Sequence, residues 1–81
     1  MDNLIGEIQL FAVDYAPKGW LACDGRQLAI KQCPELFRVL GTKFGGDGRV
    51  AFGLPDLQKA LPLKGMHYYI AVEGITPPYV K

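Results

Sequence analysis

The segment GTKFGGDGRVAFGLPDL, residues 41–57, combines glycines with basic side chains, which are the residue types of many phosphate-binding loops. A P-loop needs the pattern G-x-x-x-x-G-K-[ST] between a strand and a long helix. Here Lys43 precedes the glycine pair, and no hydroxyl residue follows that lysine. The segment also follows the predicted helix instead of leading into one. The pattern therefore predicts a loop in which glycines at positions 45–48 set the shape of the backbone.

Carboxylate and imidazole side chains are the next candidates for catalysis. Asp47 and Asp56 lie close in sequence, but nothing places either one opposite a second acid, as catalysis by paired carboxylates requires. Asp56 follows Pro55, where a capping or turn role is usual. His67 is the single histidine, and the chain contains no serine for it to activate. We expect no enzyme activity and no cofactor.

The two cysteines, Cys23 and Cys33, are far apart in sequence. Zinc sites use close pairs such as C-x₂-C together with a second pair or with histidines, so we expect no metal site. Neither thiol has a motif that would orient a histidine as its base. A disulfide between the two is an alternative, but the pattern favours two small buried or half-buried thiols.

Aromatic side chains could form a platform for sugar rings. The available ones are Trp20, Tyr15, Tyr68, Tyr69 and Tyr79. Trp20 lies between a loop glycine and an apolar run, a position typical of a ring that fills the interior. We expect Trp20 in the core, and a carbohydrate-binding surface is the alternative.

The composition fits one small domain, residues 1–81, that associates with partners. Hydrophobic residues make up 49% of the chain, whereas a lone core of this size rarely supplies more than about 3–5 kcal/mol. Surplus apolar surface usually marks an interface. The formal charge of +1 and the lack of a basic stripe argue against nucleic acid as a ligand. No segment approaches the ~20 apolar residues of a membrane span, and the N-terminus does not resemble a signal peptide, so we expect synthesis in the cytoplasm.

Hydrophobic periodicity predicts an α+β fold, mostly β, with short strands, one short helix and long glycine- and proline-rich loops. Residues 5–13 alternate like a strand with one wet face, and residues 67–75 form the clearest strand. The one good helix candidate is residues 34–40, which we expect to begin at Pro34 and to end at Gly41 in the left-handed conformation. The predicted core residues are Trp20, Leu36, Phe37 and Leu40.

The tripeptide DGR occurs twice, at residues 24–26 and 47–49. Asp-Gly supplies the positive φ that tight turns need, so we expect two turns with the same chemistry. A short buried strand is predicted before the first turn, at residues 20–23, and a short strand or a turn after it, at residues 27–30. Residues 76–81 contain two prolines and should form an extended tail.

Four motifs run through most of the chain: GEIQLFA from Gly6, APKGWLACDG from Ala16, LFRVLGTKFGGDGRVAFGLPDL from Leu36, and YYIAVEGITP ending at Pro77. In this order and combination they resemble the phage tail collar domain family, which includes the proteins called microcystin-dependent. The resemblance implies a small β-rich fold with one short helix, found on short tail fibres and typically trimeric, without a known catalytic residue. It also implies that the glycine loop is a shaped surface loop.

The chain departs from the family pattern after LPDL. Family members usually continue with R-G-R-x-P and a long variable insertion, whereas here Lys59 stands near the arginine position and the chain runs almost directly into HYYIAVEG. The insertion is essentially missing. If the insertion carries variable receptor binding elsewhere, this chain lacks that role.

We therefore expect a structural module of a phage-tail-like fibre or extracellular appendage, which self-associates or docks on longer collar-domain relatives. The alternative is a tip module that binds a receptor or a cell-surface glycan. Edge strands offer unpaired backbone groups to a neighbouring subunit, so the two best strands and the tail should form the interface. The expected interface residues are Ile8, Leu10, Tyr68, Tyr69, Ile70, Val72 and Tyr79. The expected loop residues are Gly45, Gly46, Asp47, Gly48, Pro55 and Asp56.

Overall fold

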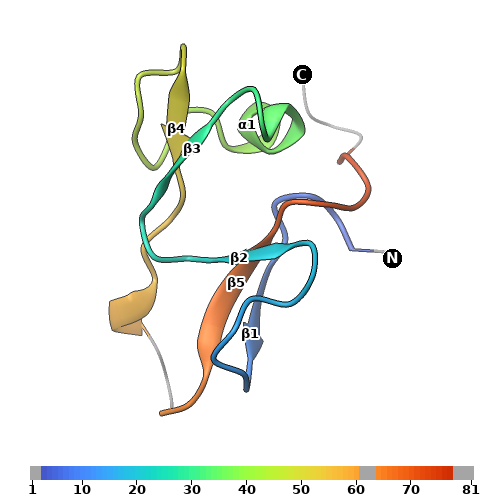
Figure 1. The fold of residues 1–81 in the computed structure, drawn as a ribbon, viewed down its shortest axis with the longest axis vertical. Helices are drawn as coiled ribbons and strands as arrows, with labels where there is room; N and C mark the ends of the chain where they lie inside the picture. Colours follow the sequence, from blue (N-terminus) through green and yellow to red (C-terminus); the bar gives the residue numbers. More distant parts are fainter. Residues whose placement is uncertain (1–2, 61–63, 78–81) are drawn as a thin grey trace.

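The computed structural model describes residues 3–60 and 64–77. In chain order the elements are β1 (Ile8–Phe11), β2 (Trp20–Ala22), β3 (Gln27–Ala29), α1 (Pro34–Leu40), β4 (Ala51–Gly53), the 3-10 helix η1 (Gln58–Ala60) and β5 (His67–Ala71). Short strands with one α-helix in the described residues confirm the predicted fold class. Figure 1 shows β3, β4 and α1 in one half of the molecule and β1, β5 and β2 in the other.

β5 is the central strand of a three-stranded antiparallel sheet with the order β1-β5-β2. Ile70 of β5 faces Ile8 of β1 on one side and Leu21 of β2 on the other. Because neighbours pair with both of its edges, β5 has no backbone groups left for another subunit. The expectation that the strand at residues 67–75 is an edge strand is therefore wrong, and β1 and β2 are the edges of this sheet.

A glycine bulge precedes β1 and shortens the strand predicted at residues 5–13. The N–H of Gly6 donates to the carbonyl of Ala71 at 2.9 Å, and the N–H of Ala71 donates to the carbonyl of Glu7, also at 2.9 Å. Two residues thus oppose one, and Gly6 has the positive φ, 91°, that this type of bulge needs. A Cβ at Gly6 would lie 2.8 Å from Cγ1 of Val39, so helix α1 packs directly on the bulge.

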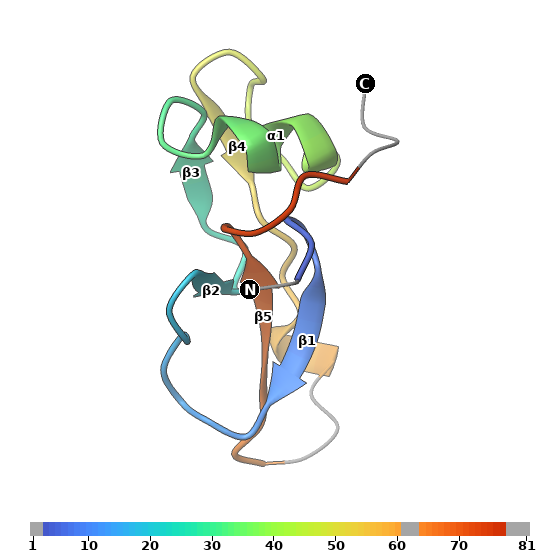
Figure 2. The same cartoon turned by 90° about the vertical axis from the view of Figure 1, so that its right-hand side faces the viewer.

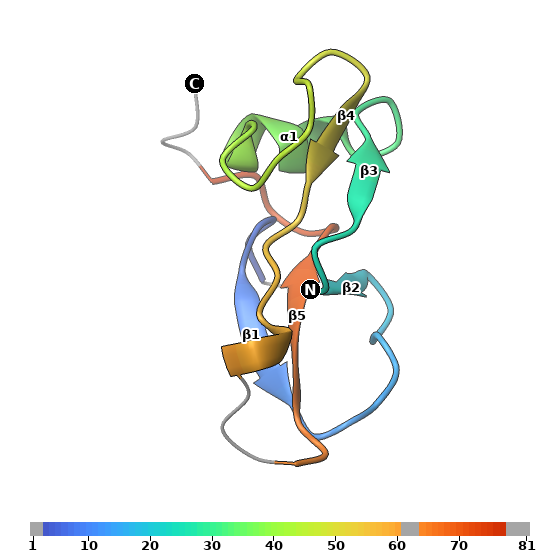
Figure 3. The same cartoon turned by 90° about the vertical axis from the view of Figure 1, so that its left-hand side faces the viewer.

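A second antiparallel ladder connects the two halves of the molecule. β3 pairs with β4, and the pairing continues towards the three-stranded sheet. The N–H of Leu54 donates to the carbonyl of Arg26 at 2.9 Å, and the N–H of Leu57 donates to the carbonyl of Cys23 at 2.9 Å. The sequences CDGR and LPDL therefore lie side by side as one continuous pairing (Figure 3).

The prediction of a turn at the first DGR tripeptide is wrong, since residues 24–26 run extended beside residues 54–56, but the two copies share one local hydrogen bond. In each copy the aspartate Oδ1 accepts a hydrogen bond from the backbone N–H of the arginine two residues later. The N–H of Arg26 lies 3.1 Å from Asp24, and the N–H of Arg49 lies 2.9 Å from Asp47. The surroundings differ, because the first copy lies within the ladder and does not reverse the chain. Gly25 in that copy keeps a positive φ of 81°.

Helix α1 has the predicted bounds. It begins with Pro34 in its first turn, where the missing N–H costs nothing, and no side chain caps it at Cys33. Gly41 ends it by donating its N–H to the carbonyl of Phe37 at 2.6 Å. The φ of Gly41 is positive as expected, at 60°, but its ψ of −143° lies outside the left-handed helical region.

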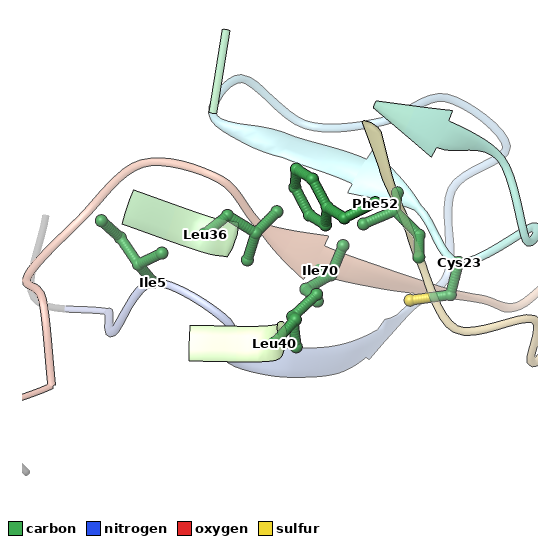
Figure 4. Close-up of a cluster of buried hydrophobic side chains, with 7 residues drawn as sticks. Ile5, Cys23, Leu36, Leu40, Phe52 and Ile70 are labelled. Atoms are coloured by element: carbon green, nitrogen blue, oxygen red, sulfur yellow. The ribbon is translucent and has the colours of Figure 1, made fainter. Parts of the chain in front are cut away.

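The core forms two clusters on the two faces of β5, because successive side chains of a strand point to opposite sides. The larger cluster, shown in Figure 4, joins the helix, the ladder and the sheet; its buried residues are Ile5, Cys23, Leu36, Leu40, Phe52, Leu54 and Ile70. The smaller cluster comprises Trp20, Tyr69 and Ala71.

The predicted core residues are not equally buried. Leu36, Trp20 and Leu40 are buried, whereas Phe37 is half-buried and lies against Phe52 with a ring separation of 5.4 Å. The rings of Trp20 and Phe11 are nearly perpendicular, with their centroids 5.1 Å apart. The loop between β1 and β2 runs beside the sheet (Figure 2). The hydroxyl of Tyr69 donates a hydrogen bond to the carbonyl of Val13 in this loop at 2.8 Å. The ring contact and the hydrogen bond together hold the smaller cluster in place.

Candidate functional site

The carboxylate of Asp47 organises the glycine loop. Its Oδ1 accepts three backbone N–H bonds, from Arg49 at 2.9 Å, Val50 at 3.0 Å and Ala51 at 3.1 Å. These bonds, that of Arg49 first, lower the pKa of Asp47 to about 2. A bound phosphate would need the same N–H groups. Because an internal carboxylate already occupies them, the loop provides no phosphate cradle there.

The glycines of the loop allow it to lie against β4. Gly45, Gly46 and Gly48 all have positive φ, at 122°, 92° and 75°, which confirms the prediction that backbone shape requires glycine here. A Cβ on Gly46 would lie 2.4 Å from Cα of Phe52, which is impossibly close. The N–H of Gly53 donates to the carbonyl of Gly45 at 2.9 Å, so loop and strand share backbone bonds.

Pro55 and Asp56 lie in the ladder that joins the two halves. Pro55 is buried, and its carbonyl accepts the N–H of Gly25 at 3.3 Å. Asp56 is exposed and accepts the N–H of Gln58 at 3.2 Å, at the start of η1. A Cβ on Gly25 would lie 3.2 Å from Cβ of Asp56, which explains why the first DGR needs its glycine. Pro55 and Asp56 therefore both have structural roles, one through its backbone carbonyl and the other through its carboxylate.

The thiols are poor candidates for nucleophilic catalysis. Both Cys23 and Cys33 are free. Burial, together with the nearby Asp24 carboxylate, raises the pKa of Cys23 to about 11, so its thiol is neutral at pH 7. Cys23, Asp24 and His67 do line a common cavity, but its volume of about 30 Å³ is that of one water molecule. Within residues 3–60 and 64–77, no group of three or more His, Cys, Asp or Glu could hold a metal ion.

Most of the aromatic rings considered for a sugar platform are inside the protein. Trp20 is 6% exposed and Tyr69 is 3% exposed. Tyr68 is half-buried, and Tyr79 lies outside the described residues. Tyr15 is the exception, with 68% of its surface exposed. The structure therefore does not gather the four rings that it describes into one exposed surface.

The expected interface residues are in different environments. Ile8 is 39% exposed at the start of β1, and Leu10 and Val72 are half-buried. Ile70 is completely buried within the chain, as Tyr69 nearly is, so placing these two at a subunit interface was wrong. They belong to the two core clusters.

Sequence reasoning missed the most exposed of the large hydrophobic side chains in the described residues. Val50 is 70% exposed, and Phe44 on the same loop is 44% exposed. Val50 lines a hollow of about 400 Å³ with Ala29, Ile30, Lys31, Pro34 and Arg49. The available signal was that Val50 directly follows the second DGR tripeptide, whose Asp47 accepts the N–H of Val50 at 3.0 Å.

Another hollow, of about 330 Å³, lies next to the smaller core cluster. It is lined by Asn3, Lys18, Gly19, Trp20, Glu73 and Gly74. The side-chain amide of Asn3 donates to the carbonyl of Glu73 at 2.8 Å, so the segment before β1 and the segment after β5 form the wall of this hollow together.

No helix among the described residues is long and apolar enough to cross a membrane.

Comparison with known families agrees with this architecture. A family model described as the phage tail collar domain matches residues 6–62, which is more than half of the 81 residues. The match extends from the bulge at Gly6 through α1 and the glycine loop to the end of the ladder, while β5 lies beyond it. No curated protein matches the chain. The chain belongs to the phage tail collar domain family.

Proposed function

We propose that the chain acts as a single-domain, non-enzymatic module that assembles with copies of itself or with longer collar-domain proteins in a tail-fibre-like particle. The observation that carries this proposal is membership of the collar family, a family of structural phage tail proteins. The chemistry of the described residues supports it, because Asp47 serves the backbone and the thiol of Cys23 is neutral and buried.

The free edge of β1 supplies a surface for such assembly. Glu7 and Ala71 are bonded across the β1–β5 ladder, and bonded pairs alternate in an antiparallel ladder, so Gln9 is the next residue bonded to β5. The N–H and C=O groups of Ile8 and Leu10 therefore point to the opposite side, where the sheet has no further strand among the described residues. A strand of a neighbouring subunit can pair there.

Light scattering on the purified protein at micromolar concentration tests the proposal, alone and mixed with longer collar-domain proteins. We expect an assembly larger than the monomer in at least one of the two samples. A folded monomer that stays monomeric in both would refute the structural role.

A pair of substitutions at Ile8 then tests the edge. Ile8→Pro removes the outward N–H without breaking a bond to β5, whereas Ile8→Thr keeps that N–H and a β-branched side chain. We expect the proline variant to dissociate at protein concentrations where the threonine variant stays assembled. Circular dichroism must show that both variants are folded.

A tip module that binds a cell-surface glycan is the second candidate. The hollow beside Trp20 favours it, because Lys18 and Glu73 line it together with the ring, and charged side chains of these types bond sugar hydroxyls. The support is weaker, since only 6% of Trp20 is exposed for stacking. If this function holds, Lys18→Ala weakens glycan binding in an array assay while the assembly state stays unchanged.

A further inference from the structure

We infer that copies of this chain join head to tail, with Tyr15 of one copy seated in the hollow beside Val50 of the next. This inference rests on the proposed assembly role and names the surfaces through which copies meet. It is independent of the edge of β1.

The receiving surface is an apolar hollow with basic residues. Its volume is about 400 Å³, and its lining comprises the apolar residues Ala29, Ile30, Pro34 and Val50 and the basic residues Lys31 and Arg49. Val50 is 70% exposed, although transfer of such a side chain out of water is favourable. The hollow therefore has the apolar surface and the positive charge to receive an aromatic side chain next to an acid.

Val50 is held rigidly in this position. Its N–H donates to the carboxylate of Asp47 at 3.0 Å, and its carbonyl accepts the N–H of Ile30 at 2.9 Å. A preformed surface loses little conformational freedom when it binds. The acids nearby have other bonds: Asp47 accepts three backbone N–H groups, and Glu35 accepts the hydroxyl of Thr76 at 2.9 Å. Arg49 and Lys31 thus remain for an incoming carboxylate.

The loop between β1 and β2 has the matching chemistry. Tyr15 is 68% exposed, second only to Val50 among the exposed large hydrophobic side chains, and the exposed Asp14 precedes it. Tyrosine is enriched at the energetic centres of interfaces, and opposite charges on two surfaces select the register. Lys18 of the same loop lines the hollow beside Trp20 instead. The tip of the loop thus presents an aromatic ring with an acid.

The two surfaces lie in different halves of the molecule. The hollow belongs to the half formed by β3, β4 and α1, while residues 12–19 run beside the three-stranded sheet (Figures 1 and 2). One copy therefore cannot place its own Tyr15 beside its own Val50. A contact between unlike surfaces repeats from copy to copy, and it closes into a ring or continues as a filament.

A charge exchange tests the pairing. Asp14→Lys or Arg49→Glu alone should raise the dissociation constant of the assembly, because each puts like charges at every contact. Both substitutions in one chain restore one pair of opposite charges at every contact while Lys31 stays unchanged, so the double variant should have a lower dissociation constant than either single variant. Tyr15→Ala should raise the dissociation constant about 30-fold or more, which is the effect of a residue at an energetic centre. Val50→Ala should raise it about tenfold, because it removes two buried methyl-sized groups.

Lys43→Glu is the matched control, since it makes the same charge change on the glycine loop but does not line the hollow. Analytical ultracentrifugation measures the dissociation constants, and circular dichroism verifies folding. A double variant no tighter than the single variants, or a Lys43→Glu effect equal to that of Arg49→Glu, would overturn the pairing. If the wild type assembles while the Tyr15 and Val50 variants also assemble normally, the pairing is wrong and the assembly role stands. A wild type that is monomeric by itself refutes the pairing, whereas the assembly role fails only if the chain also stays monomeric when mixed with longer collar-domain proteins.

Discussion

Replacing Gly46 by alanine should destabilise the protein far more than the same change at the neighbouring Gly45. Both residues have positive φ, 92° and 122°, so both variants carry backbone strain. Only Gly46 lies against backbone: its added Cβ would be 2.4 Å from Cα of Phe52 and 2.5 Å from the carbonyl oxygen of Ala51, whereas a Cβ on Gly45 meets nothing within 4 Å. The pair therefore separates strain from steric overlap.

The magnitudes follow from these distances. A sparsely populated backbone conformation costs about 1–3 kcal/mol, and restricting the unfolded chain returns about 0.4–1 kcal/mol. Gly45→Ala should therefore lose at most about 2.6 kcal/mol. Carbon atoms pack best at about 3.5–4.0 Å, so the Gly46 variant must move its loop away from β4 by more than about 1 Å. We expect a loss of about 3–5 kcal/mol, against a total near 4–12 kcal/mol for a chain of this length.

Urea unfolding, followed by the fluorescence of the single tryptophan, Trp20, measures these losses. Gly53→Ala adds a second test: its Cβ would lie 2.4 Å from the carbonyl of Phe44 at an ordinary φ, so it should also be severe. Lys43→Ala should stay within about 0.5 kcal/mol, as an exposed substitution. If Gly45→Ala costs as much as Gly46→Ala, contact with β4 does not determine the loop. If Lys43→Ala harms assembly more than every glycine substitution, the loop binds a charged ligand.

Three further predictions use other parts of the molecule. The pKa of Asp47 is lowered from 3.8 to about 2, so its contribution to stability is complete above pH 4 and disappears as the pH falls towards 2; the difference in melting temperature between the wild type and Asp47→Asn should shrink over that range, and a constant difference would contradict the bonds to the carboxylate. Leu40→Ala should lower the free energy of unfolding, measured in urea, by about 2–5 kcal/mol, and Phe37→Ala should lower it less because Phe37 is half-buried. Losses under about 0.5 kcal/mol for both variants would place α1 outside the core. Iodoacetamide at pH 8 should label Cys33 before Cys23, because burial is greater at Cys23 and raises its pKa to about 11; a folded Cys23→Ala, Cys33→Ala double variant should still assemble, whereas stoichiometric zinc in a native preparation would refute the absence of a metal site.

Local signals predicted the elements whose causes are local. Pro34 and Gly41 bracket α1, because one lacks an N–H and the other accepts positive φ, and the helix has the predicted bounds. The glycine-rich sequence predicts positive φ for at least one of the glycines at positions 45, 46 and 48, and all three have it. Each of these features depends on the covalent structure of a residue and a few neighbours.

Strand order could not be predicted in this way. The sequence HYYIAVEGI favours a strand wherever it is placed, but its position between β1 and β2 depends on which segments meet it in space. Ile70 reads equally well as an interface residue or a core residue until both faces of β5 are seen to be covered. Val50 shows the opposite case, because this apolar residue directly before β4 is 70% exposed although its type alone favours burial.

The sequence by itself determined the fold class, the helix bounds, the glycine-dependent loop and the resemblance to collar domains, since these depend on residue type and spacing along the chain. Only the tertiary structure decided that β5 is the central strand, that Asp47 occupies the N–H groups a phosphate would use, and that Tyr15 and Val50 are exposed in different halves of the molecule. The physical reason is that burial and edge pairing depend on contacts between segments far apart in sequence. A residue's own type and its neighbours set its backbone preference, but they do not set which surface covers it.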